Sequence, residues 1–184
     1  MVKGSYHHGD LRRAILTAAG EAIAERGVAA LSLRDVARRA GVSHAAPVHH
    51  FGDKTGVLTA LATEGFDLLT ATLTAEPSRN LTETGVAYVR FAVAHKGHFE
   101  VMFRPDLQHA DDPELAAARQ RAGDVLAEAV RAVSDDRMAR VAAWSLVHGF
   151  ATLWLSGALP PDVTVDVEAS ARAVAATLFP PAPG

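Results

Sequence analysis

The feature that most constrains the fold of this chain is a pair of short amphipathic segments joined by Gly41-Val42-Ser43. Before the joint, apolar side chains recur at the three- and four-residue spacing of one helix face, from Leu33 to Ala40. After it, Ser43 is placed to cap a second short helix that ends at Phe51-Gly52. Two helices this short are typical of a DNA-binding helix-turn-helix or of an ordinary corner in a helical bundle. The spacing alone leaves both open.

The rest of the sequence predicts an all-α fold. Alanine is abundant, strand-like alternation is scarce, and apolar positions keep the helical period along most of the 184 residues. Capping residues, glycines and prolines then set the ends of the segments. The predicted helices cover about residues 10–27, 32–40, 43–51, 54–74, 81–96, 113–134, 136–159 and 165–179.

Charge is distributed unevenly along the chain. Residues 1–54 hold eight Lys and Arg against five Asp and Glu, whereas residues 55–184 hold ten against sixteen. A basic N-terminal part on an acidic body suggests an anionic partner such as nucleic acid. The excess is modest, so chance is the alternative explanation.

The composition excludes several classes of protein. Without cysteine there is neither a disulfide framework nor a thiolate metal site, which is consistent with a reducing cytoplasm. We find no signal peptide and no apolar run long enough for a membrane span. The histidine pairs lack an acidic residue that would complete a metal site, and no catalytic motif or cofactor loop is present. We therefore predict no metal, no cofactor and no membrane partner, and an enzyme is the weak alternative.

At this point a family resemblance becomes specific. The segments YHHGDLRRAILTAA and LSLRDVARRAGVSHAAPVHHFGDK, with the apolar helix that follows, resemble the tetracycline-repressor (TetR-like) family over about residues 6–66. A subgroup of that family has Ala-Ala-Pro in the recognition helix, as at Ala45-Ala46-Pro47, and Trp-x-x-x-His-Gly further on, as at Trp144, His148 and Gly149. The resemblance implies an Ω-shaped dimer of all-helical protomers. It places a three-helix DNA-binding domain at residues 1–54 and a ligand-binding and dimerisation domain at 55–184.

The chain departs from the family pattern inside the recognition helix. Ala46-Pro47-Val48 stands where the family often has Thr-Leu-Tyr, so the tyrosine that usually contacts a DNA phosphate is missing. Pro47 crowds the Ser43 carbonyl if Ser43 is the N-cap. We therefore expect the recognition helix to begin irregularly, or one to three residues late.

Side-chain chemistry assigns roles in DNA binding. Lys54, at the start of a helix, is predicted to contact a phosphate as a point charge. Ser32, Arg34 and Ser43 are predicted to donate to phosphate oxygens. His44, Ala45 and His49 are the candidates for contacts to base edges, with solvated surface imidazoles as the alternative for the two histidines. His50 is either a phosphate contact or a helix-packing residue.

The C-terminal part holds the candidate ligand site. Trp144 and His148 lie one helical turn apart and face the same way, which gives an apolar pocket one polar group. Tyr88, Phe99, Met102 and Phe103 are predicted to line the same pocket. The competing interpretation is a packed core in which His148 has an internal partner.

The segment 136–159 is apolar on more than one side, which predicts burial on more than one side. We assign the face with Trp144 and His148 to the ligand. The other face is assigned to a partner protomer, together with the last helix, and the resemblance likewise implies an interface made by the last two helices. The predicted dimer-interface residues are Val147, Phe150, Ala151, Trp154, Val174 and Leu178.

Together these features predict a cytoplasmic bacterial transcriptional regulator. The prediction is a homodimeric repressor that binds palindromic double-stranded operator DNA and is released from it by a small organic molecule. Besides the enzyme, one alternative is a DNA-binding regulator whose pocket is filled by side chains and which has no ligand switch.

Overall fold

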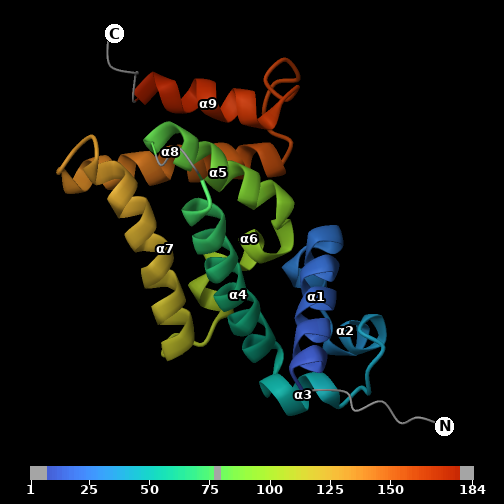
Figure 1. Ribbon diagram of the computed structural model, residues 1–184. Helices are drawn as coiled ribbons and strands as arrows, with labels where there is room; N and C mark the ends of the chain where they lie inside the picture. The colour runs from blue at the N-terminus through green and yellow to red at the C-terminus, as the bar shows by residue number, and fades with distance from the viewer. Residues whose placement is uncertain (1–7, 77–79, 179–184) are drawn as a thin grey trace. The chain divides into compact units, whose positions relative to one another are not determined.

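The computed structural model describes residues 8–76 and 80–178, shown in Figure 1. Within these residues the secondary structure is helical and contains no strand, so the all-α prediction is confirmed. The elements are α1 (His8–Arg26), η1 (Val28–Ala30), α2 (Leu33–Arg39), α3 (Ala46–Phe51), α4 (Lys54–Thr74), α5 (Leu81–Ala94), α6 (Lys96–Met102), η2 (Pro105–Leu107), α7 (Pro113–Arg131), α8 (Arg137–Leu155) and α9 (Val167–Leu178). In the same residues no helix has the length and apolar character of a membrane span.

These helices gather into two compact units. The N-terminal unit consists of the described residues of Met1–Gly65 together with His95–Ala116. The C-terminal unit consists of the described residues of Phe66–Ala94 and Ala117–Gly184. Helix α4 therefore contributes to both units, and α6 and η2 pack with the N-terminal helices. The functional boundary that we placed at residue 54 is a separate question and stays a prediction.

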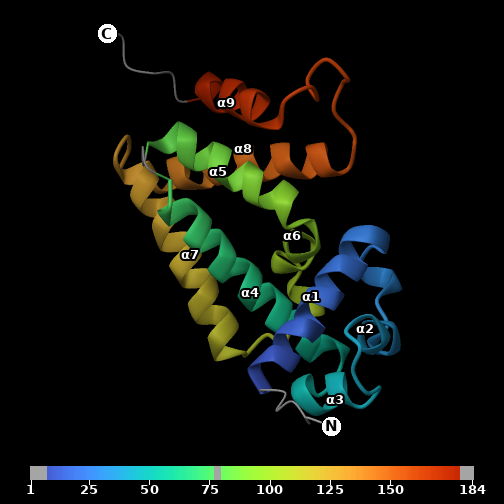
Figure 2. The same cartoon turned by 45° about the vertical axis from the view of Figure 1, so that its right-hand side comes forward.

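The N-terminal unit is built around α1. Its face with Ile15, Ala19 and Ile23 is fully buried, and α6 lies beside it (Figure 2). The two helices approach so closely that a Cβ atom added to Gly97 would lie 2.0 Å from the carbonyl oxygen of Gly20. Backbone therefore meets backbone at this crossing, and any side chain at Gly97 would hold the helices apart.

A second tight approach fixes the junction between α3 and α4. Gly52 ends α3 with φ of 81°, in the left-handed region that favours glycine. The Asp53 carboxylate then accepts the Gly56 N–H at 2.7 Å and caps α4. A Cβ atom on Gly56 would lie 1.8 Å from the Phe51 carbonyl oxygen. Glycine at this position therefore allows α3 to sit directly against the first turn of α4.

The C-terminal unit has α5 at its centre, packed against α8 and α9 (Figure 1). Eight of the fourteen residues of α5 are buried: all those from Thr84 to Ala92 except Arg90. Two ion pairs join α5 to α9: Arg172 with Glu83 at 2.7 Å, and Arg90 with Glu168 at 3.3 Å. The Arg172 guanidinium lowers the pKa of Glu83, so this carboxylate is charged in its pair.

Most helix ends follow their local signals. Helix α7 begins at Pro113, as the predicted range of 113–134 required, and the Asp112 carboxylate caps it by accepting the Leu115 N–H at 2.8 Å. Helix α8 ends at Leu155, four residues earlier than the break that we had placed at Leu159. Gly157 has φ of 69°, and the Ala158 N–H donates back to the Leu153 carbonyl at 3.1 Å. This is a glycine C-cap, which the two prolines downstream had obscured in the sequence.

Candidate functional site

Helices α2 and α3 form the predicted helix-turn-helix. Gly41 has φ of 67°, which provides the left-handed residue that the turn requires. The Val42 N–H donates to the Ala37 carbonyl at 3.0 Å, and the half-buried Val42 side chain follows directly. The turn therefore has the local structure that Gly41-Val42-Ser43 indicated.

The start of the recognition helix differs from the simplest prediction. Helix α3 begins at Ala46 with Ala45 as N-cap, two residues later than capping by Ser43 would give, and no side chain caps it. The late start was expected from Pro47, which is buried in the first turn. The capping role of Ser43 was wrong. Ser32 does occupy the N-cap position of α2, but its side chain makes no cap hydrogen bond.

Asp35, three residues after Ser32, is used in an ion-pair network instead of a capping box. Its carboxylate accepts from Arg26 and Arg38 and, at 3.0 Å, from Arg39. Arg39 also pairs with Glu25 at 2.6 Å. The hydrogen bonds from Arg38 and Arg26 lower the pKa of Asp35 to about 2. Much of the basic charge of this unit is therefore matched by its own carboxylates.

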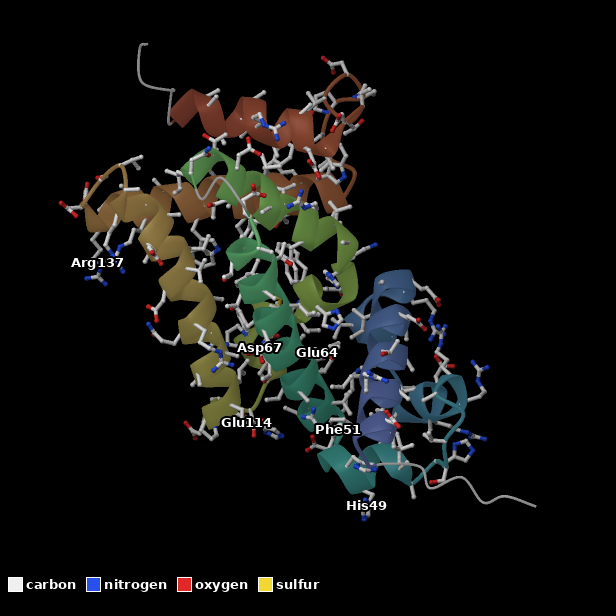
Figure 3. All side chains as sticks on the ribbon, in the orientation of Figure 1. His49, Phe51, Glu64, Asp67, Glu114 and Arg137 are labelled. Carbon is white, nitrogen blue, oxygen red and sulfur yellow. The ribbon has the colours of Figure 1, made fainter. Side chains whose placement is uncertain are left out.

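The residues predicted to bind DNA are mostly exposed. Two of them, His50 and Lys54, are half-buried, and the exposed ones are Ser32, Arg34, Ser43, His44, Ala45 and His49. Figure 3 shows the His49 side chain pointing away from α3 and the helices of its unit. Among the described residues Arg34 has no ion-pair partner, unlike Arg26, Arg38 and Arg39. This leaves its guanidinium available to a phosphate.

Two further side chains belong to this surface. Val48 is 51 % exposed on α3, one turn after His44 and Ala45, although we had treated it only as the loss of a tyrosine. Lys54 does more than stand at the start of α4, since its Nζ donates to the Val28 carbonyl at 3.3 Å. The sequence carried no signal for this contact, because 26 residues separate the two groups.

In the C-terminal unit, three of the predicted ligand-binding residues touch one another. The Trp144 indole N–H donates to the Tyr88 hydroxyl at 3.3 Å. The same hydroxyl lies 2.9 Å from Nδ1 of His148. Tyr88 is fully buried, His148 is half-buried, and Trp144 is 42 % exposed. The chain of hydrogen bonds thus runs from a buried phenol to the edge of α8.

The protonation of this chain follows from its chemistry. Trp144 can only donate, so both hydrogen bonds form when Tyr88 accepts from the indole and donates its own proton to Nδ1 of His148. Burial lowers the pKa of His148, which favours the neutral imidazole that this arrangement needs. Burial likewise raises the pKa of the Tyr88 phenol and keeps it protonated.

Two family descriptions match the chain. "Bacterial regulatory proteins, tetR family" matches residues 15–61, over α1 to α4. "Tetracyclin repressor-like, C-terminal domain" matches residues 81–178, more than half of the chain. The chain belongs to the TetR family. The family resemblance seen in the sequence is therefore confirmed, with an N-terminal helix-turn-helix and a C-terminal helical domain.

Individual proteins are also similar to this chain. The HTH-type transcriptional repressor Rv3405c of Mycobacterium tuberculosis is 38% identical over 74 residues, which are 40% of this chain and 39% of that protein. The match thus spans about two fifths of the length of this relative. A protein of unknown function from Rhodococcus sp. RHA1 is 33% identical with a TM-score of 0.73, covering 95% of this chain and 96% of that one.

A third likeness concerns the fold alone. The TetR-like regulator LfrR from Mycobacterium smegmatis, whose structure is a complex with proflavine, is 22% identical with a TM-score of 0.72, covering 93% of this chain and 96% of that one. The matched family consists of regulatory proteins, and the curated relative Rv3405c is a transcriptional repressor; neither is described as an enzyme.

The other three residues predicted to line the TetR ligand pocket lie on or directly after α6, in the N-terminal unit. Met102 is fully buried, and a Cβ atom on Gly65 of α4 would come 2.7 Å from its sulfur. Phe99 is buried and packs edge-on against Phe103, with ring centroids 5.6 Å apart. Tyr88, Trp144 and His148 thus form one cluster, and the α6 side chains form another.

The faces of α8 also differ from our assignment. Phe150 and Ala151 were predicted to meet a partner protomer, but they are buried inside their own unit. Val147 and Trp154 are half-buried, as is Val174 of α9, and the side chain of Leu178 lies outside the described residues. The face of α8 left open carries Met138, Val141, Ala142, Ser145, Thr152 and Leu153. Sequence reasoning missed this outer face because apolar residues occur on every side of α8.

Proposed function

We propose that this protein is a DNA-binding transcriptional repressor that occupies a palindromic operator as a homodimer and leaves it when a small organic ligand binds. The observation that carries the proposal is the exposed, polar outer surface of a helix-turn-helix in a chain of the TetR family. On this proposal the protein acts in the bacterial cytoplasm, where the operator is.

The proposed DNA contacts follow from exposure and chemistry. Arg34, Ser32 and Ser43 donate to phosphates, and Lys54 adds a point charge. His44, Ala45 and His49 approach base edges, where the Ala45 methyl group meets a thymine methyl. Val48 adds an exposed apolar group to the same surface. His50, which is half-buried on α3, is proposed to contact a phosphate.

Purified protein is expected to bind DNA from its own promoter region, with an affinity that falls steeply as salt rises because phosphate contacts release counterions. Lys54→Ala should weaken binding to all sequences alike, whereas His49→Ala should change the order of preference among operator variants. Titration of labelled duplexes at several salt concentrations measures both effects. Absence of binding at every salt concentration would refute the repressor, and uniform weakening by His49→Ala would remove His49 from the base contacts.

For the effector, we propose a site bordered by Trp144, Tyr88 and His148. An indole face and a neutral imidazole suit an apolar organic molecule with one hydrogen-bonding group. We also propose that the chain belongs to the Trp-x-x-x-His-Gly subgroup, whose motif would place Trp144 and His148 at this site. The assignment of Phe99, Met102 and Phe103, which belong to the N-terminal unit, stays a prediction from the sequence.

Reciprocity tests the ligand switch. A compound found by thermal-shift screening of small organic molecules should bind more weakly when operator DNA is present, by the same factor by which it weakens DNA binding. Coupling of this kind is typically about 5- to 150-fold. Calorimetric titration with and without operator gives the factor. Equal affinity in the two titrations would show that the compound is not an inducer.

The proposed dimer uses the outer face of α8. Met138, Val141 and Leu153 are each between 45% and 64% exposed, which is unusual for large apolar side chains on one helix. Ala142 and Ser145 between them would let a second helix approach closely. On α9, the exposed Ala169 and Ala173 offer a similar surface. Val147, Trp154 and Val174 are then the supporting layer beneath the interface.

A further inference from the structure

The backbone of Val28 in the N-terminal unit is held on both sides of its Cα atom by charged side chains. The Val28 N–H donates to Oε1 of Glu100, on α6, at 2.7 Å. The Val28 carbonyl accepts from Nζ of Lys54, the first residue of α4, at 3.3 Å. Glu100 and Lys54, which are far apart in the sequence, therefore meet at the backbone of a single residue between α1 and α2.

The local backbone explains why Val28 needs an outside acceptor. Gly27 has φ of 78° and ψ of 160°, so the chain leaves α1 and restarts as η1. The Val28 N–H is the first of that short helix and has no carbonyl one turn earlier to bond with. Val28 is also buried, which makes an unpaired N–H costly. The half-buried carboxylate of Glu100 supplies the missing partner.

The two hydrogen bonds act on the two peptide groups that flank the Cα atom of Val28. The bond to Glu100 fixes the Gly27–Val28 peptide group, and this limits how far the Val28 carbonyl on the other side of the Cα atom can turn. That carbonyl also accepts from the Leu31 N–H at 3.2 Å, which keeps it in a fixed position. The Lys54 ammonium uses one of its three protons on this oxygen and keeps two for other acceptors.

A second link holds the chain after α6 against the same part of α4. The His109 N–H donates to Oγ1 of Thr59 at 2.9 Å. The His109 ring lies 3.7 Å from the carboxylate of Asp53, the residue that precedes Lys54. Because α6 is fixed relative to α4 in this way, Glu100 reaches Val28 from a defined position.

We infer that Glu100 is a positioning residue for operator binding, which fixes the backbone of Val28 and so helps to hold the Lys54 ammonium at the DNA-facing end of α4. The inference rests on the proposed function. A free lysine side chain samples many rotamers, and holding one of them before DNA arrives lowers the entropy lost on contact with a phosphate. Glu100 itself touches no DNA.

The direction in which operator affinity changes when Glu100 is replaced distinguishes a positioning role from a purely electrostatic one. Removal of an acidic residue should by itself strengthen binding to a polyanion. Glu100→Ala is instead expected to weaken operator binding about tenfold and to lower the slope of log affinity against log salt by about one phosphate contact. Glu100→Asp, which keeps the charge but retracts the acceptor, should do the same. Glu100→Gln keeps an acceptor oxygen and should stay within about twofold of wild type.

The matched control is Glu21→Ala, because Glu21 is an exposed acid on α1 of the same unit. This variant should bind DNA as tightly as wild type or slightly more tightly. In a Lys54→Ala background, Glu100→Ala should cause no further loss, since the group that it positions is absent. Labelled operator titrations across a salt series give affinity and slope together, and thermal unfolding checks that each variant is folded.

Additive losses in the double variant, an unchanged salt slope, or equal behaviour of Glu100→Ala and Glu21→Ala would each overturn the inference. If Glu100→Ala does not fold, the comparison of Glu100→Asp with Glu100→Gln decides in its place. Wild-type protein that binds no promoter DNA would refute the proposed function itself. Wild-type binding with an unaffected Glu100→Asp variant would refute only the role of Glu100.

Discussion

Replacing Leu153 with glutamate is expected to convert the protein from a dimer into a monomer and to weaken operator binding by about 100-fold or more. Leu153 is 46 % exposed on the outer face of α8 that we assign to the interface. In a two-fold symmetric contact each change appears twice, so two carboxylates would be buried close together without partners. Loss of the dimer then removes the second half-site contact, which accounts for the large effect on DNA binding.

Sedimentation at micromolar concentration, followed by operator titration, measures this prediction. The control is Ala117→Glu, which adds the same charge to an exposed position of α7 in the same unit. That variant should remain dimeric and should bind operator nearly as well as wild type. A Leu153→Glu variant that sediments as a dimer would move the interface away from this face of α8.

The second large effect is expected at the crossing of α1 and α6. A methyl group added by Gly97→Ala would lie 2.0 Å from the Gly20 carbonyl oxygen and 2.8 Å from its carbonyl carbon. Both are backbone atoms, so the overlap is relieved only if the helices separate. We expect the free energy of unfolding to fall by about 3 kcal/mol, the upper range for overpacking.

The same chemical change at Gly123 should have the opposite sign. Gly123 lies within α7, and a Cβ atom there would meet nothing within 4 Å. Gly123→Ala should therefore stabilise the protein by up to about 1 kcal/mol, the difference in helix propensity. Urea unfolding of both variants tests the pair. Equal stability of Gly97→Ala and wild type would mean that the helices part without cost.

Local signals made much of this structure predictable. Gly41, Gly52 and Asp112 act within a few residues of their own position, so the turn of the helix-turn-helix and the start of α7 followed from the sequence. Pro47 likewise predicted the late start of α3. The Ser43 cap failed because the same proline moved the helix start past the serine.

Contacts between distant segments were not predictable in the same way. Glu100 resembles any acid on a short helix until Val28 is seen beside it. On α8, apolar residues occur on all sides, so periodicity could not tell the buried face from the open one. We assigned the large side chain of Phe150 to the partner protomer, but it is buried within its own protomer.

The placement of the tryptophans has a spectroscopic consequence. The chain has two tryptophans, Trp144 and Trp154, and both lie on α8 in the C-terminal unit. Intrinsic indole fluorescence therefore reports on that unit, while the helix-turn-helix contributes no indole signal. Emission from Trp144, whose N–H is bonded to Tyr88, should respond to molecules that bind beside it. Circular dichroism follows the helices of both units, so a difference between the two melting curves would reveal whether the units unfold separately.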